Sequence, residues 1–169
     1  MDIIDFAMKM ELDGKEFYEK QAMDTANPEL KKILLQLAEE EGRHYEYFRR
    51  LKEDESDLSG GALLAGNTTL ENVKNIFEQM AENSEKKSFG EDDIAVWRQA
   101  LRTEEKSEAF YMEKAAQEPN AERKNLLLKI AREENNHVQM IDGVLMYLKH
   151  PDTFADSAQF KNFRSLEGW

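Results

Sequence analysis

The chain contains no cysteine. This absence excludes disulfides, thiol catalysis, iron–sulfur clusters and cysteine-ligated zinc or iron. Metal chemistry in this chain must therefore use glutamate, aspartate and histidine ligands. Proline and glycine are also scarce, at 3 and 8 of 169 residues, so that long uninterrupted helices can form.

Long hydrophobic runs and an excess of basic residues are missing as well. No stretch approaches the ~18 apolar residues of a membrane span, and the N-terminus lacks the basic and apolar regions of a signal peptide. The formal net charge is −12, which disfavours nucleic acid and anionic membranes as partners. We therefore expect a cytoplasmic protein with no nucleic-acid partner and no membrane partner.

Hydrophobic residues recur with helical spacing along the chain, and no segment alternates in the manner of a strand. Two pairs of long helices are expected, one within residues 1–54 and one within 91–150. Asn27 and Asn120 lie at the turns of these hairpins, where each can cap the second helix of its pair. Each pair is therefore predicted to be an antiparallel helical hairpin.

The connection between the two pairs, residues 55–90, is long. It begins with a glycine- and serine-rich loop, and a short amphipathic helix is expected over about 69–85. The tail, residues 151–169, is rich in aromatic residues and is expected to cover apolar surface or to pack on a partner subunit. Residues 1–150 are thus predicted to form one all-α domain, an antiparallel four-helix bundle with a long crossover.

The two helix pairs are copies of one another. A shift of 93 positions aligns them without a gap across a whole hairpin and its turn. Unrelated amphipathic hairpins would rarely share the turn length, the capping residue and a Glu-x-x-His motif. The repeat predicts a pseudo-twofold axis through the bundle. The aligned pairs include Ala7 with Ala100, Glu11 with Glu104, Tyr18 with Tyr111, Asn27 with Asn120, Glu41 with Glu134 and His44 with His137.

Two Glu-x-x-His motifs occupy equivalent places in this repeat. Glu41 precedes His44 by three residues, and Glu134 precedes His137 by the same spacing. The third histidine, His150, has no such glutamate before it. One motif would be weak evidence in a chain so rich in glutamate, but two at equivalent positions indicate a shared site.

Four glutamates, one from each long helix, fall within the apolar stripe of their helix at about 100° per residue. They are Glu11, Glu41, Glu104 and Glu134. The neighbours Glu39 and Glu40 are expected to point elsewhere. Any one inward glutamate could be a core polar residue or a surface group. Four of them would repel one another and lose solvation worth several kcal/mol each, and no matching arginine or lysine points inward.

A pair of divalent cations explains these buried charges. We predict a two-metal site in which each ion takes one histidine, the motif glutamates bridge, and the other two glutamates are terminal. Two iron ions are expected, with manganese or zinc as alternatives. The predicted ligands are Glu11, Glu41, His44, Glu104, Glu134 and His137. Tyr18 and Tyr111 lie two turns beyond the first glutamate of each pair, either as hydrogen-bond donors to a ligand carboxylate or as ordinary core residues.

These motifs are similar to those of a known family. Glu11 with Phe17 and Tyr18, the segment Leu-Ala-Glu-Glu-Glu-Gly-Arg-His over 37–44, and their second copies resemble the rubrerythrin branch of the ferritin-like superfamily. The resemblance covers roughly residues 1–150. It implies a non-haem di-iron centre that reduces hydrogen peroxide or dioxygen in oxidative-stress defence.

Two departures from that family pattern stand out. Rubrerythrins proper carry a cysteine-ligated iron domain that supplies electrons, so a chain without cysteine implies a separate electron-donor protein. Rubrerythrins also typically have an extra glutamate where this chain has Ser107. Glu108 lies within about 40° of the same helix face, either as an extra ligand or as a solvent-facing residue.

Three functions remain open at this point. The first is a di-iron peroxidase or oxidoreductase, the second a ferroxidase or iron-handling protein, and the third a non-catalytic, metal-stabilised interaction module. A homodimer, formed through the connection or the tail, is expected for each of them.

Overall fold

The computed structural model of the chain describes residues 2–54, 69–82 and 89–156. All regular structure in these ranges is helical, as the sequence predicts. The helices are α1 (Ile3–Asp24), α2 (Pro28–Glu53), α3 (Thr69–Glu82), α4 (Glu91–Gln117), α5 (Ala121–Lys149) and the 3₁₀ helix η2 (Pro151–Asp156). Within the described ranges, no helix combines the length and the apolar character that a membrane span requires.

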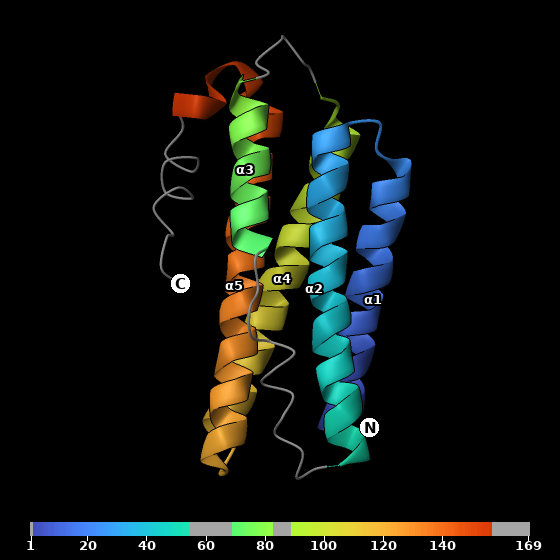
Figure 1. The fold of residues 1–169 in the computed structure, drawn as a ribbon, viewed down its shortest axis with the longest axis vertical. Coiled ribbons are helices and arrows are strands. Elements are labelled where there is room, and N and C mark those ends of the chain that lie inside the picture. The colour runs from blue at the N-terminus through green and yellow to red at the C-terminus, as the bar shows by residue number, and fades with distance from the viewer. Residues whose placement is uncertain (1, 55–68, 83–88, 157–169) are drawn as a thin grey trace.

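The four long helices form two hairpins, α1 with α2 and α4 with α5, which lie side by side along the bundle (Figure 1). The predicted caps are present at both turns. Asn27 Oδ1 accepts a hydrogen bond from the Leu30 amide at 2.9 Å, and Asn120 Oδ1 accepts from the amides of Glu122 and Arg123 at 3.0 Å each. The repeat seen in the sequence is therefore also a repeat of structure.

The short helix of the crossover is α3, which lies against α2, along the upper half of the bundle in Figure 1. On α5, a Cβ atom added to Gly143 would lie 3.0 Å from Phe77 Cζ, so a glycine at this position allows α3 to approach closely. Phe77 also packs on Phe154 of η2, whose ring in turn contacts Tyr147. The start of the tail thus covers apolar surface, while the predicted loop at 55–68 and the rest of the tail lie outside the described residues.

The hydrophobic core consists of two clusters, one toward each end of the bundle. One contains Leu34, Leu37 and Ile141 together with the residues of α3 and η2. The other contains Phe48 and Tyr111 at the opposite end, without α3. A layer of buried charged residues lies in the middle of the bundle, and this layer is the candidate site.

Candidate metal centre

The structure brings all six predicted ligands together in the middle of the bundle. Each is almost fully buried, with an exposed fraction of at most 4%. The four glutamates come from the inward stripes of α1, α2, α4 and α5, and the two histidines from one turn further along α2 and α5. The helical periodicity of the sequence therefore predicted correctly which of these side chains point inward.

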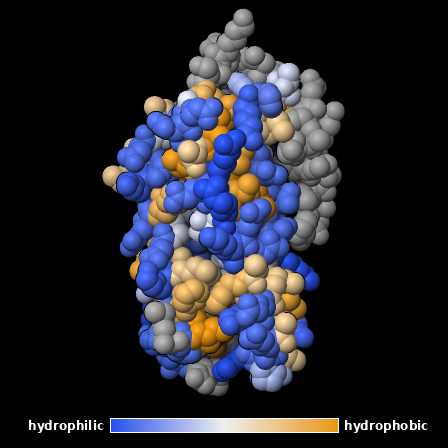
Figure 2. Space-filling view, turned by 180° about the vertical axis from the view of Figure 1, so that it is seen from behind, coloured by the Kyte–Doolittle hydropathy of each residue, from blue (hydrophilic) through white to orange (hydrophobic). Residues whose placement is uncertain are grey.

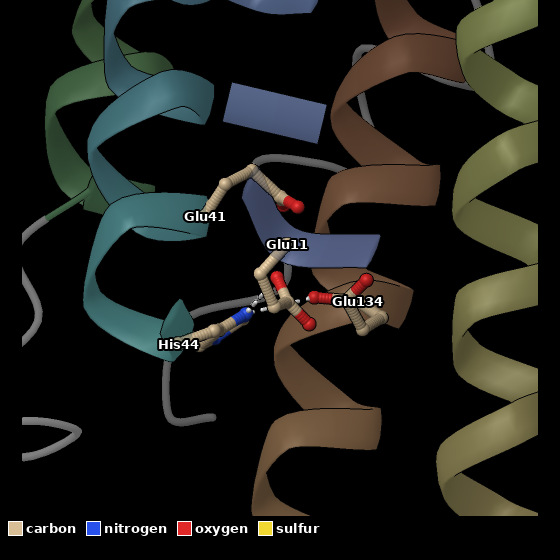
Figure 3. A group of neighbouring side chains, drawn as sticks. All are labelled: Glu11, Glu41, His44 and Glu134. Atoms are coloured by element: carbon tan, nitrogen blue, oxygen red, sulfur yellow. Dashed lines mark hydrogen bonds and ion pairs between the residues drawn. The ribbon is translucent and has the colours of Figure 1, made fainter. Parts of the chain in front are cut away.

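The six side chains form two overlapping groups, in each of which one ligand atom per residue lies within 4.8 Å of the others. The groups are Glu11, Glu41, His44 and Glu134, and Glu41, Glu104, Glu134 and His137. Figure 3 shows the first group, whose side chains converge on one space between α1, α2 and α5. Glu41 and Glu134 belong to both groups, which is the arrangement expected of residues that bridge two ions.

Both imidazole rings direct Nδ1 toward the carboxylates. His44 Nδ1 lies 3.0 Å from Glu134 Oε1 and 3.3 Å from Glu11 Oε2. His137 Nδ1 lies 3.2 Å from Glu41 Oε1 and 3.3 Å from Glu104 Oε2. Each ring thus offers one nitrogen to the centre and leaves Nε2 for a second contact.

The two predicted tyrosines donate hydrogen bonds to ligand carboxylates across the hairpins. The Tyr18 hydroxyl donates to Glu104, and the Tyr111 hydroxyl donates to Glu11. Burial, with the charge of these carboxylates, raises the pKa of both tyrosines well above 10, so that each retains its proton and remains a donor. The hydrogen-bonding alternative is therefore correct, and each tyrosine orients a carboxylate of the other hairpin.

Burial dominates the protonation of the shared glutamates. Burial, followed by the charges of Glu11 and Glu104, raises the pKa of Glu134 to about 8. Burial and then the charge of Glu104 likewise raise the pKa of Glu41 well above its ordinary value of 4.5. Without a cation, the Glu134 side chain therefore tends to hold a proton at neutral pH, and burial shifts the pKa of Glu41 in the same direction.

The pKa values of the two histidines are also raised, but here the shift favours the charged form, because carboxylates surround both rings. Burial alone would lower the pKa of His44, but the charge of Glu11 and hydrogen bonds to carboxylates raise it well above 6.5. Glu104 has the same net effect on the pKa of His137. Burial would raise the pKa of Glu104 itself, but His137 lowers it overall. The surrounding carboxylates thus favour the charged form of both imidazoles, and two metal ions would supply more positive charge at the same place.

Within the described part of the chain, three buried oxygens of the centre have no well-aligned hydrogen bond: Glu41 Oε1 and both carboxylate oxygens of Glu134. Two of them face a histidine Nδ1 at ion-pair distance, Glu134 Oε1 at 3.0 Å and Glu41 Oε1 at 3.2 Å. A buried carboxylate oxygen without a donor is costly unless a cation is bound to it. Oxygen and imidazole donors suit iron, manganese and zinc, so these residues fit the pair of metal ions that the sequence predicts.

Two acidic residues next to the centre were not expected there. Glu40 is only 1% exposed and Glu133, its equivalent in the repeat, 8%. The prediction that Glu40 points away from the apolar stripe is therefore wrong. Glu133 accepts a hydrogen bond from His44 Nε2 at 2.7 Å, and Glu40 accepts one from Arg43. The signal was in the sequence, because each of these glutamates lies four residues before a ligand histidine and hence on its face of the helix.

The proposed extra ligand Glu108 does not reach the centre. Its side chain is half-buried, and both carboxylate oxygens accept hydrogen bonds from Asn135 Nδ2 at 3.2 Å. It belongs to neither ligand group. The extra-ligand interpretation of Glu108 is therefore not supported by the structure, because its position on α4 directs it to α5 beside the centre instead of into it.

A cavity of about 310 Å³ leads from the surface between α1 and α4 to the centre. The carboxylates of Glu41, Glu104 and Glu134 form part of its wall. Gly14 and Ser107, which are equivalent in the repeat, also line it. The cavity therefore gives small molecules from solvent a route to the ligand carboxylates.

Gly14 lies directly against the carboxylate of Glu41. A Cβ atom there would lie 2.6 Å from Glu41 Oε2, which is closer than two such atoms can approach. The carboxylate of Glu41 thus occupies the space that any other side chain at this position would need. Sequence reasoning had noted Ser107 but not its partner, although the shift of 93 positions relates the two.

The comparisons with known proteins agree with this geometry. Residues 2–59 match the family model described as rubrerythrin, which covers α1 and α2 with Glu11, Glu41 and His44. No curated protein and no solved structure matches the chain. The match of the N-terminal third, together with the repeated Glu and His set in α4 and α5, is consistent with a rubrerythrin-like member of the ferritin-like superfamily.

Proposed function

We propose that the protein is a di-iron oxidoreductase that reduces hydrogen peroxide or dioxygen in oxidative-stress defence. The observation that carries the proposal is the pair of overlapping ligand groups with Glu41 and Glu134 in common. Two iron ions held there would supply two electrons in one step. Hydrogen peroxide takes up two electrons and two protons and gives two water molecules, so that no radical is released.

The chain's own residues have defined parts in this proposal. Glu11 with His44, and Glu104 with His137, would each hold one ion, and the two shared glutamates would hold both. Tyr18 and Tyr111 keep two of these carboxylates oriented through their hydrogen bonds. The cavity between α1 and α4 admits a small oxidant to the carboxylates.

The electrons must be replaced from outside the chain. Since no cysteine is present, no rubredoxin-type iron can be bound by these 169 residues. We propose a separate electron-donor protein as the partner. The cytoplasmic location stays a prediction from the composition and the N-terminal sequence.

Rapid mixing of the anaerobic, iron-loaded protein with peroxide or dioxygen tests the proposal. We expect two iron ions per chain. A single equivalent of peroxide should oxidise both ions, and absorption spectroscopy monitors this oxidation. Preferential reaction with dioxygen and retention of more than two iron ions would instead favour iron handling. Bound zinc and no response to either oxidant would favour the non-catalytic interaction module and would overturn the proposal.

A further inference from the structure

The two halves of the repeat differ at both positions between the motif glutamate and the motif histidine, and one of these differences changes the charge. Arg43 separates Glu41 from His44 on α2, and its equivalent on α5 is Asn136, between Glu134 and His137. All six ligands are identical between the two halves. A charged residue in one half and a neutral one in the other therefore place an asymmetry of charge beside ligands that are the same in both halves.

Arg43 is the ion-pair partner of Glu40. The guanidinium of Arg43 donates to the Glu40 carboxylate one turn before it. The Glu40 side chain is 2% exposed, so this ion pair is well shielded from water on the carboxylate side. Asn136 offers no positive charge to Glu133, and its own Oδ1 is buried without a hydrogen-bond partner in the described part of the chain.

The two ligand histidines have different surroundings as a result. His44 Nε2 donates to Glu133 Oε2 at 2.7 Å. His137 Nε2 is buried and, among the described residues, has no hydrogen-bond partner. Glu40, the repeat equivalent of Glu133, is paired with Arg43 instead. One imidazole therefore has a carboxylate behind it, and the other does not.

Glu40, Glu133 and His44 also lie close enough to resemble a third group of ligands, within 4.8 Å of one another. All three already have partners: Glu40 is paired with Arg43, and Glu133 with His44. This group is therefore a layer of residues around His44 and not a third metal site.

We propose that Arg43 makes the two metal positions unequal, and that the position of Glu11 and His44 binds a divalent ion more tightly than the position of Glu104 and His137. A carboxylate that accepts the outer N–H of a ligand histidine orients the ring and strengthens its bond to the metal. Loss of such a partner typically lowers metal affinity by about 10–100-fold. The first ion should therefore fill the Glu11–His44 position before the second ion binds.

This inference rests on the metal centre of the proposed function and not on any reaction there. It is tested with Co²⁺ alone, added to the metal-free full-length protein. Calorimetric titration gives the two affinities, and anomalous scattering from crystals grown with one equivalent of Co²⁺ gives the occupancy of each position. We expect two binding steps that differ at least about tenfold, with the Glu11–His44 position filled first.

The repeat supplies a matched pair of variants. Arg43→Asn frees Glu40 to accept a hydrogen bond from His137. We therefore expect tighter Co²⁺ binding at the Glu104–His137 position and two affinities that differ less than in the unsubstituted protein. Asn136→Arg should draw Glu133 away from His44 and weaken the Glu11–His44 position by about 10-fold or more. Because the first variant gains affinity, a folding defect cannot imitate its expected result.

Other outcomes would decide against the inference. Equal occupancy of both positions at one equivalent of Co²⁺ would overturn it, as would an Arg43→Asn variant whose two affinities remain as far apart as before. In both cases the metal centre itself would stand. Failure to bind any Co²⁺ would overturn the proposed metal centre and this inference together.

Discussion

At the residue scale, Gly14 lies in the middle of α1, where glycine lowers helix stability by about 0.5–1 kcal/mol relative to alanine. We expect Gly14→Ala to stabilise the helix but to displace the Glu41 carboxylate, because the new Cβ would lie 2.6 Å from Glu41 Oε2. Metal affinity should fall by at least about tenfold, as for a misplaced ligand. Titration with Co²⁺ measures this change.

Gly42→Ala is the matched control, since Gly42 is also a helical glycine in the same hairpin. A Cβ at that position would lie 3.4 Å from the flexible end of Lys15 and would touch no ligand. We expect the same gain in helix stability without any loss of metal affinity. Unchanged Co²⁺ affinity in Gly14→Ala would contradict the role assigned to this glycine.

The protonation of the centre predicts how stability depends on pH. Glu134 has a folded-state pKa of about 8 against an ordinary value of 4.5, and the pKa values of Glu41 and both ligand histidines are raised as well. The folded metal-free protein therefore binds more protons than the unfolded chain. Its free energy of unfolding should fall as pH rises from about 6 to 8, by ~1.4 kcal/mol per pH unit for each proton involved.

Urea denaturation at pH 6, 7 and 8, with and without bound metal, measures this dependence. The metal-loaded protein should show the opposite slope, because protons compete with the ions for the same side chains. In the metal-free state, Glu134→Gln should flatten the pH dependence, since it removes one of the groups responsible. A metal-free protein whose stability rises between pH 6 and 8 would contradict these protonation states.

Some features of the centre could be predicted from the sequence and others could not. The six ligands could be predicted because a repeat and a helical stripe select the same side chains independently. The partners of Tyr18 and Tyr111 could not, because they depend on how one hairpin lies against the other. Periodicity within a helix carries no information on that packing. The pairing of Glu133 with His44 likewise depends on tertiary contacts, because it joins α5 to α2.

At the scale of elements, α3 stabilises one end of the bundle without touching the centre. Phe77 is 1% exposed and packs on Phe154. We expect Phe77→Ala to lower the free energy of unfolding by about 3–5 kcal/mol, the usual cost of truncating a buried phenylalanine. The metal content per chain should not change, because Phe77 is not a ligand.

Urea denaturation and elemental analysis of the same samples check both parts. Met23→Ala serves as control, since Met23 is 81% exposed and its truncation should change stability by no more than about 0.5 kcal/mol. Loss of bound metal in Phe77→Ala would show instead that α3 and the centre are coupled.

The elements also differ in how well the sequence predicted them. Hairpin turns were predicted closely, because capping asparagines and a proline act locally. The existence of α3 was equally clear from its amphipathic pattern. Its position was not, because an apolar face indicates that a helix is covered but not by which partner. Gly143 is informative only once α3 is known to lie against it.

At the scale of the whole molecule, the surface over α1 and α4 carries exposed apolar side chains. Phe6 is 45% exposed and Met112 50%, and Figure 2 shows two hydrophobic areas on this face with hydrophilic residues between them. We propose a homodimer that covers part of this surface, whereas the sequence predicts a homodimer formed through the connection or the tail. Light scattering should give the mass of two 19.7 kDa chains.

Introduction of a charged residue into this surface tests the proposed dimer. Phe6→Glu should shift the protein toward the monomer and leave its helix content unchanged by circular dichroism. A much larger particle would contradict the dimer and would favour an iron-storing cage. A monomeric parent protein would show that the apolar surface has no second copy on it.

The division of the ligands between the two hairpins has a consequence for synthesis in the cell. The first position takes Glu134 from α5, and the second takes Glu41 from α2, so neither hairpin alone offers a complete set. As the chain leaves the ribosome, α1 and α2 emerge with three of the four residues of the first group, Glu11, Glu41 and His44. The complete set for either proposed ion would form only after the last long helix has docked. Full coordination of the proposed metal pair would therefore be a late event in folding.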